Sequence, residues 1–175
     1  MRSLVAVLLV FLPMLVEARR AAANQRAQRA RGGIEPSGDV YAWMRVAYPG
    51  AFLLMIGEGA LRPGLPAAAV AAGVTLFALA KALKWWAILA LGPSWTFRLI
   101  VVPGARLLAG GPYRFMRHPN YVAVVFELIA VALATGARIA GPVAVVGFGV
   151  LMLKRIAVED RALLPAPQLP GPSPW

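Results

Sequence analysis

Long apolar runs alternate with short polar segments along this chain. Runs of this length favour helices over strands, and the longest reach the roughly 20 residues that a helix needs to cross a bilayer. We therefore expect an all-α, polytopic membrane protein with about five transmembrane helices in a single domain, residues 1–164. The predicted spans are residues 3–18, 42–61, 65–91, 122–135 and 139–153.

The composition favours a bilayer as the solvent of these helices. Hydrophobic residues make up 60% of the chain and charged residues only 14%, and the mean hydropathy is +0.70. Soluble domains carry about 25% charged residues. One small core cannot bury this much apolar surface, so we expect membrane lipids to surround the helices.

The basic residues predict the orientation. The chain has 18 Lys and Arg against 7 Asp and Glu, a net charge of +11. Nucleic-acid-binding proteins can be as basic. Here the bases lie beside apolar runs, which favours cytoplasmic loops, and we expect no nucleic acid partner. With the N-terminus outside, only Arg2, Arg62 and Arg138 lie outside, as expected for a bacterial cell membrane.

The two ends of the chain differ from the middle. Residues 3–18 resemble either a retained first span or a cleaved signal peptide. Arg19 and Arg20 stand where a cleavage region should be neutral, which favours the retained span. Residues 19–31 carry five arginines and predict a separate basic helix on the cytoplasmic surface. The proline-rich tail, residues 165–175, is expected to be disordered.

Residues 110–121 carry the chain's only histidine, His118, together with arginines and tyrosines. Arginine and histidine donate hydrogen bonds to carboxylates or phosphates, and tyrosine rings can stack on a flat ligand. The stretch therefore predicts a binding site for a charged ligand with an aromatic ring. A basic aromatic loop that only anchors the protein at the membrane surface is the alternative.

A second polar group follows the last apolar run. Arg155 and Glu159 are four residues apart and share one helix face. An exposed ion pair worth about 0.5 kcal/mol or less is the alternative. Because the turn at residues 136–138 is short, the fourth and fifth spans form an antiparallel hairpin. The hairpin should bring both side chains to His118 and Tyr121, around one cofactor on the cytoplasmic side.

Two further patterns exclude common kinds of site. The chain has no cysteine, which excludes disulfides, thiolate metal sites and cysteine nucleophiles, and we expect no metal. Gly57-x-Gly59 ends a span and Gly147-x-Gly149 lies inside one. Neither opens a helix as a phosphate-binding loop does, so these glycines are interpreted as helix-packing positions.

The two polar groups and the hairpin between them resemble the isoprenylcysteine carboxyl methyltransferase family, over about residues 84–164. That family is integral to the membrane and uses S-adenosylmethionine. The matching motifs are Gly111-Pro112-Tyr113-x-x-x-Arg117-His118-Pro119-x-Tyr121 and Arg155-Ile156-x-x-Glu159-Asp160-x-x-Leu163. Leu91-Gly92-x-x-Trp95-Thr96 and Val102-Pro103-Gly104 extend the match.

The resemblance implies a role for each matching residue. Arg155 would face the methyl acceptor, and Asp160 stands where the family often has a glutamate. The residues implied to bind S-adenosylmethionine are Leu107, Leu108, Tyr113, His118, Pro119, Asn120, Tyr121 and Glu159.

Glu127 is an ionisable residue inside a predicted span and is therefore a second catalytic candidate. It lies seven residues after Asn120, about two helical turns, and could face the same cavity as a base. A carboxylate acceptor needs no base because it is already ionised near neutral pH, whereas a hydroxyl does better with one. The alternative is a helix-pairing role for Glu127 with Lys81, Lys84 or Arg98.

The methyl acceptor remains open at this stage, although a lipophilic or prenylated molecule is expected. The family resemblance implies a prenylated carboxylate. Glu127, Trp95-Thr96-x-Arg98 and the segment Arg29–Glu35 also resemble a bacterial subgroup that methylates alkylpyrone and alkylresorcinol hydroxyls. Phospholipid N-methylation is a third option, and a membrane scaffold or small transporter is the non-enzymatic one.

Overall fold

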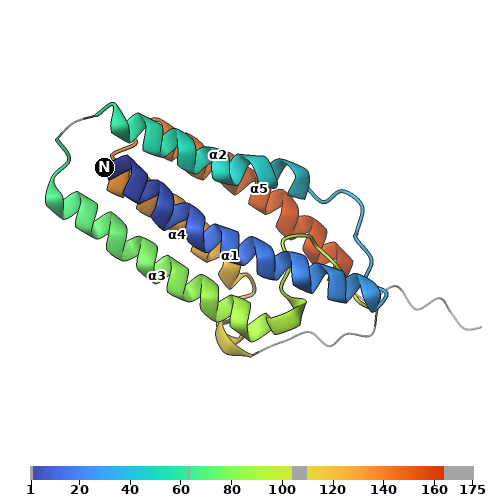
Figure 1. Ribbon diagram of the computed structural model, residues 1–175. Coiled ribbons are helices and arrows are strands. Elements are labelled where there is room, and N and C mark those ends of the chain that lie inside the picture. The colour runs from blue at the N-terminus through green and yellow to red at the C-terminus, as the bar shows by residue number, and fades with distance from the viewer. Residues whose placement is uncertain (1, 63, 104–109, 164–175) are drawn as a thin grey trace, which may run out of the picture.

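The computed structural model describes residues 2–62, 64–103 and 110–163, and within these ranges the fold is all-helical. Five α-helices lie side by side in an elongated bundle (Figure 1). The only β-pairing in the described ranges is a single antiparallel bridge between Ile34 and Val101. The helices are α1 (Arg2–Ala30), α2 (Tyr41–Ala60), α3 (Ala67–Leu91), α4 (Pro119–Thr135) and α5 (Ala140–Leu163). Two 3₁₀ helices lie between α3 and α4: η1 (Gly92–Ser94) and η2 (Gly111–Arg114).

The first helix is longer than predicted. The apolar run and the basic segment form one 29-residue helix, α1, so the prediction of a separate surface helix was wrong. Residues 19–30 are rich in Ala, Arg and Gln, which are good helix formers, and nothing between the two segments breaks the helix. Gly32 follows with a φ of 79°, which glycine adopts at little cost. The residues predicted to form a disordered tail, 165–175, lie outside the described ranges.

The predicted hairpin of the last two helices is confirmed. Gly136 ends α4 in the left-handed conformation, with a φ of 70°. The Glu58 carboxylate accepts hydrogen bonds from the backbone N–H groups of Arg138, Ile139 and Ala140. These donors have no partner within α5, and the charge of Glu58 suits the helix N-terminus. α2 therefore fixes the start of α5.

Glycines bring α4 into close contact with both α3 and α2, and of these glycines only Gly59 was among the predicted packing positions. A Cβ atom on Gly73 would lie 2.5 Å from the Ala134 nitrogen, and one on Gly59 would lie 2.5 Å from the Thr135 oxygen. Cβ atoms on the three other predicted packing glycines, Gly57, Gly147 and Gly149, would meet nothing within 4 Å. Their predicted packing role was wrong, because the rotation of each helix turns them away from its neighbours.

Gly73 therefore gives a testable prediction. Alanine in place of glycine inside a helix normally gains up to about 1 kcal/mol. In Gly73→Ala the added methyl group meets the backbone of α4, and overpacking of this kind costs about 1–3 kcal/mol. Thermal unfolding in detergent should show Gly73→Ala less stable and the control Gly147→Ala at least as stable as the parent chain. Equal shifts in both variants would contradict the prediction.

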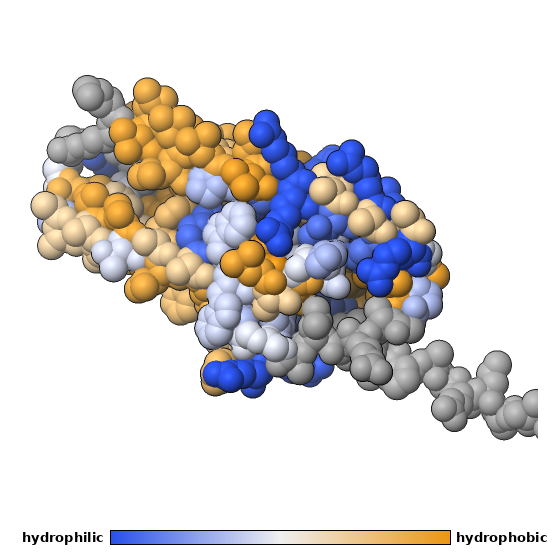
Figure 2. Space-filling model, turned by 60° about the horizontal axis from the view of Figure 1, so that its bottom comes forward, coloured by the Kyte–Doolittle hydropathy of each residue, from blue (hydrophilic) through white to orange (hydrophobic). Residues whose placement is uncertain are grey.

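Two of the helical segments are long and apolar enough to cross a membrane, Ala67–Ser94 and Ala140–Ala162, and α4 is apolar but shorter. Apolar side chains cover one end of the bundle, and hydrophilic ones gather toward the other (Figure 2). The hydrophilic end includes the C-terminal parts of α1 and α5 and the segment between α3 and α4 (Figure 1). The described residues of the two predicted polar groups, residues 110–121 and 155–160, lie there.

Candidate functional site

Tyr121 joins α4 to α5 at the hydrophilic end of the bundle. Its hydroxyl donates a hydrogen bond to Glu159 Oε2 at 2.8 Å and accepts one from Arg155 Nε at 3.0 Å. Tyr121 lies in the first turn of α4, and the two partners lie one turn apart on α5. The predicted contact of Arg155 and Glu159 with Tyr121 is confirmed.

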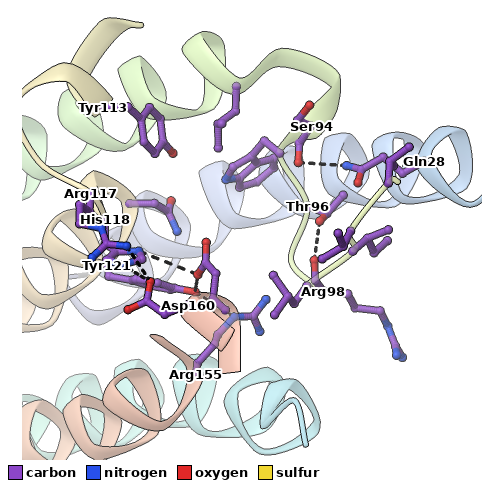
Figure 3. A pocket seen from close by; sticks show the side chains of 18 of the residues that line it. Gln28, Ser94, Thr96, Arg98, Tyr113, Arg117, His118, Tyr121, Arg155 and Asp160 are labelled. Carbon is purple, nitrogen blue, oxygen red and sulfur yellow. Dashed lines mark hydrogen bonds and ion pairs between the residues drawn. The ribbon is translucent and has the colours of Figure 1, made fainter. Parts of the chain in front are cut away.

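His118 completes this group from the residue before α4. Its Nδ1 atom lies 3.9 Å from Glu159 Oε2, and its Nε2 atom lies 3.7 Å from Asp160 Oδ1. The imidazole ring lies against the Tyr121 ring, with 5.4 Å between the centroids. Arg117 forms a 3.3 Å ion pair with Asp160. Figure 3 shows Arg117, His118, Tyr121 and Asp160 gathered on one side of a cavity.

Arg155 is 6% exposed and held from three directions. Its guanidinium donates to Asp39 Oδ1 at 3.2 Å and to the Phe97 carbonyl oxygen, and it lies 5.9 Å from the centre of the Tyr41 ring. From the sequence, Asp39 was expected only as part of a loop. An acidic residue directly before the second span was the available signal, but its partner is 116 residues away.

The first cavity, here called the polar cavity, has a volume of about 410 Å³, within the usual size range of ligand pockets. Five of the eight predicted cofactor-binding residues line it: Tyr113, His118, Asn120, Tyr121 and Glu159. Pro119 does not line it; this residue is fully buried and forms the first position of α4. Leu107 and Leu108 lie outside the described residues. The remaining walls come from Gln28, Arg31, Leu91, Ser94, Trp95, Thr96, Arg98, Leu99, Ile100, Val101, Val102, Arg117, Arg155 and Asp160.

A second cavity of about 390 Å³, here called the apolar cavity, adjoins the first. The two share four lining residues: Thr96, Asn120, Tyr121 and Arg155. The Oδ1 atom of Asn120 is buried and has no hydrogen-bond partner among the described residues. Buried polar atoms are rarely left in this way, so Asn120 indicates a ligand contact where the two cavities meet. The other lining residues are Met14, Ala18, Ala21, Ala22, Gln25, Tyr41, Met44, Arg45, Tyr48, Pro49, Lys84, Phe97, Val124 and Phe148.

The tyrosines of the polar cavity are neutral hydrogen-bonding groups. Burial raises the pKa of the Tyr113 phenol, and the negative charge of Glu159 adds to this effect. Burial also raises the pKa of Tyr121, and the opposing charge of Arg155 does not cancel the shift. A raised phenol pKa favours the protonated form, so both hydroxyls remain donors at neutral and moderately alkaline pH.

The basic half of α1 forms hydrogen bonds to residues 92–95, part of the segment that lines the polar cavity. Asn24 donates to the carbonyl oxygens of Gly92 and Trp95, and Gln28 donates to those of Pro93 and Ser94. Neither amide was predicted from the sequence, because this half of α1 was expected to be a basic surface helix. Helical position alone does not show which polar residue faces a partner about 65 or more residues away.

Glu35 links α1 to the segment after α3 through two ion pairs. Its carboxylate pairs with Arg29 and, at 2.8 Å, with Arg98. The hydrogen bond from Arg29 keeps the pKa of Glu35 below its usual value, and Arg98 adds to the effect. These are residues of the two segments that resemble the bacterial subgroup, and they belong to one structural unit beside the polar cavity.

Glu127 lies elsewhere and is fully buried. It pairs with Lys81 at 3.1 Å and Lys84 at 3.4 Å, and both lysines also pair with Glu17 at 2.8 Å. We call Glu17, Lys81, Lys84 and Glu127 the buried charge cluster. The Tyr48 hydroxyl donates to Glu127. Glu127 lines neither cavity, so its contacts are those of the helix-pairing alternative, with Lys81 and Lys84 as partners.

The polar cavity has the groups that a ligand with both charges requires. Glu159 and Asp160 can bind cationic parts, Arg117 can bind a carboxylate, and tyrosine rings flank them. No group of three or more His, Cys, Asp or Glu suited to a metal occurs in the described residues. The site is therefore suited to a charged organic ligand that reaches the junction of the two cavities.

Comparisons with known proteins identify the family of the chain. The uncharacterized protein YpbQ of Bacillus subtilis (strain 168) is 29% identical over 160 residues, which cover 91% of this chain and 94% of that protein. No solved structure matches the chain. Residues 73–165, which include every described residue of the His118–Glu159 group, match the isoprenylcysteine carboxyl methyltransferase family. The chain therefore belongs to this family, which indicates a methyltransferase that acts in a membrane.

Proposed function

We propose that this protein is an S-adenosylmethionine-dependent O-methyltransferase that acts on a lipophilic acceptor, of the isoprenylcysteine carboxyl type. The observation that carries the proposal is the junction of two different cavities. Both have largely apolar surfaces, but the first has acidic and basic side chains in its wall, whereas the second has no acidic ones among its described lining residues and a smaller polar share. They meet at Asn120, Tyr121 and Arg155, where a methyl donor and a lipid-tailed acceptor would face each other.

In this proposal all five helices span the membrane, with the N-terminus outside and the site on the cytoplasmic side. Val10 and Glu17 of α1 are buried in the bundle, which favours a retained first span over a cleaved signal peptide. Lys81 and Lys84 were expected among the cytoplasmic bases, but both belong to the buried charge cluster. Thirteen of the 18 basic residues then remain on the cytoplasmic side of the membrane and three on the outer side, so the excess of basic residues on the cytoplasmic side is kept.

The residues of the polar cavity fit S-adenosylmethionine. Glu159, His118 and Tyr121 would bind its polar cationic part, Tyr113 would lie against its adenine, and the free Oδ1 atom of Asn120 would gain a partner. When bound, this cofactor supplies a methyl group on a sulfonium centre, whose C–S bond breaks as the acceptor oxygen bonds to the carbon. Arg155, held by Asp39, would orient the acceptor oxygen from the shared wall. Alignment of this kind contributes much of the rate of such displacements.

For the acceptor we propose the prenylated carboxylate class first. The contacts of Glu35 give specific support to a second candidate, a long-chain alkylpyrone or alkylresorcinol hydroxyl. Glu35 connects Arg29 with Arg98, and so it joins the two segments that resemble the bacterial subgroup.

Transfer of a labelled methyl group tests the proposal directly. Purified full-length protein in detergent is incubated with methyl-labelled S-adenosylmethionine and prenylcysteine, alkylpyrone, alkylresorcinol or phosphatidylethanolamine acceptors. Label in an organic extract with one of the oxygen acceptors is expected. A scaffold or transporter would transfer no label and would show no saturable binding of the cofactor by calorimetry.

Glu127→Gln separates its two possible roles. Because Glu127 pairs with two lysines and lines neither cavity, we expect the variant to be less stable. Among correctly folded molecules, the rates with carboxylate and hydroxyl acceptors should fall by the same factor. A selective loss with hydroxyl acceptors would instead identify Glu127 as a base that acts through Tyr48.

A further inference from the structure

Asp39 connects three parts of the chain that are far apart in the sequence. Its Oδ1 atom accepts hydrogen bonds from the Tyr41 backbone N–H at 3.0 Å and from Arg155 Nη1 at 3.2 Å. Its Oδ2 atom accepts one from the Leu99 backbone N–H at 3.3 Å. The side chain is only 15% exposed. Asp39 therefore ties the start of α2 and the segment after α3 to the Arg155 side chain of α5.

All three nitrogen atoms of the Arg155 guanidinium have partners from other segments. Nε donates to the Tyr121 hydroxyl at 3.0 Å, Nη1 donates to Asp39, and Nη2 donates to the Phe97 carbonyl oxygen. A guanidinium has five N–H donors, so one on each terminal nitrogen has no acceptor among the described residues. The side chain extends from α5 toward the polar cavity (Figure 3) and lines both cavities. These two N–H groups can therefore donate to an oxygen atom at the junction.

Asp39 is the one charged partner among these three. A hydrogen bond between two charged groups is roughly twice as strong as a neutral one, so the carboxylate contributes most to the orientation of the guanidinium. Asp39 lines neither cavity, and its effect on a bound ligand must pass through the residues that it holds. It also precedes the part of the chain that matches the family, so family membership assigns it no role.

We propose that Asp39 is a positioning residue of the methyl transfer. Its charge holds the Arg155 guanidinium in the orientation that aligns the acceptor oxygen with the methyl group. The proposal rests on the proposed function and adds the loop between α1 and α2 to the site. A misplacement of about 1 Å at the reacting atoms can cost about 100-fold in rate. Loss of the Asp39 charge should therefore lower kcat more than it weakens the binding of either ligand.

Asp39→Asn removes the charge with little change in shape. The amide group of asparagine would face one of the donors that the carboxylate now accepts, so the hold on Arg155 weakens. Full-length protein in detergent is assayed with methyl-labelled S-adenosylmethionine and a prenylcysteine acceptor, with an alkylpyrone in a parallel series. We expect kcat to fall roughly 10- to 100-fold, while KM for the acceptor and the calorimetric affinity for the cofactor stay within about threefold of the parent chain.

A double variant separates positioning from a general structural role. Lysine at position 155 keeps the charge but not the fork of N–H donors that Asp39 orients. Asp39→Asn should therefore lower kcat by less than about threefold in the Arg155→Lys background. Glu35→Gln is the matched control, because it removes another acid of the same loop, whose partners are Arg29 and Arg98. Its effect on kcat should be the same in both backgrounds. An equal loss in both backgrounds for Asp39→Asn would overturn the proposal.

The orientation of Arg155 also gives a readout without cofactor or acceptor. In protein that contains isotope-labelled arginine, the NMR signal of the Arg155 Nε–H group is identified by its loss in Arg155→Lys. Asp39→Asn should shift or broaden this signal, and Glu35→Gln should leave it unchanged. An unchanged kcat in Asp39→Asn would overturn the role of Asp39 alone. Absence of methyl transfer in the parent chain, with the signal still moved by Asp39→Asn, would overturn the methyltransferase proposal and leave the hold of Asp39 on Arg155 standing.

Discussion

Glu159→Ala is expected to weaken S-adenosylmethionine binding by roughly 10- to 150-fold, which corresponds to the loss of a charged hydrogen bond worth about 1.5–3 kcal/mol. Glu159 accepts the Tyr121 hydroxyl hydrogen bond at 2.8 Å and lies 3.9 Å from His118. Its removal takes a negative charge from the wall that would bind a cationic ligand. It also leaves the Tyr121 hydroxyl without its carboxylate acceptor. Calorimetric titration of the purified variant in detergent measures the change.

Two further variants separate charge from hydrogen bonding. Glu159→Gln keeps an acceptor for Tyr121 and should lose less affinity than Glu159→Ala. Asp160→Asn should have a smaller effect than either, because Asp160 is the more exposed of the two acids. If Glu159→Ala and His118→Ala both bind the cofactor as the parent chain does, while remaining equally stable, then the polar cavity is not the cofactor site.

The part of the site that the sequence predicted well depends on short-range rules. The four-residue spacing of Arg155 and Glu159 places them on one helix face, and the short turn at residues 136–138 forces a hairpin. Those two rules are sufficient to bring Glu159 to Tyr121. The length of the hydrophobic runs also predicted the five helices, because each helix contains one long apolar run.

The part that was missed depends on contacts between distant segments. Asp39 reaches Arg155 across 116 residues, and Asn24 reaches the Gly92 carbonyl across 68. No periodicity connects such positions, since each partner is chosen by how the helices rotate when they pack. The same rotation explains the glycines: Gly59 meets Thr135, whereas Gly57 on the same helix meets nothing.

Lys84→Met is expected to destabilise the protein by about 3–5 kcal/mol, because it removes one partner from a buried ionic group and leaves uncompensated charge. Lys84 lies 2.8 Å from Glu17 and 3.4 Å from Glu127, and it is 2% exposed. Thermal unfolding in detergent measures the loss. Lys154→Met is the matched control, since Lys154 on α5 is exposed, and a surface substitution of this kind changes stability by no more than about 0.5 kcal/mol.

A double variant identifies charge imbalance as the cause. Lys84→Met combined with Glu17→Gln removes one charge of each sign and leaves Lys81 and Glu127 as a pair at 3.1 Å. If uncompensated charge is responsible, then the double variant should recover at least about half of the stability that Lys84→Met loses. If the double variant is instead less stable than Lys84→Met, then packing of the lysine stem, and not charge balance, holds α1, α3 and α4 together at this depth.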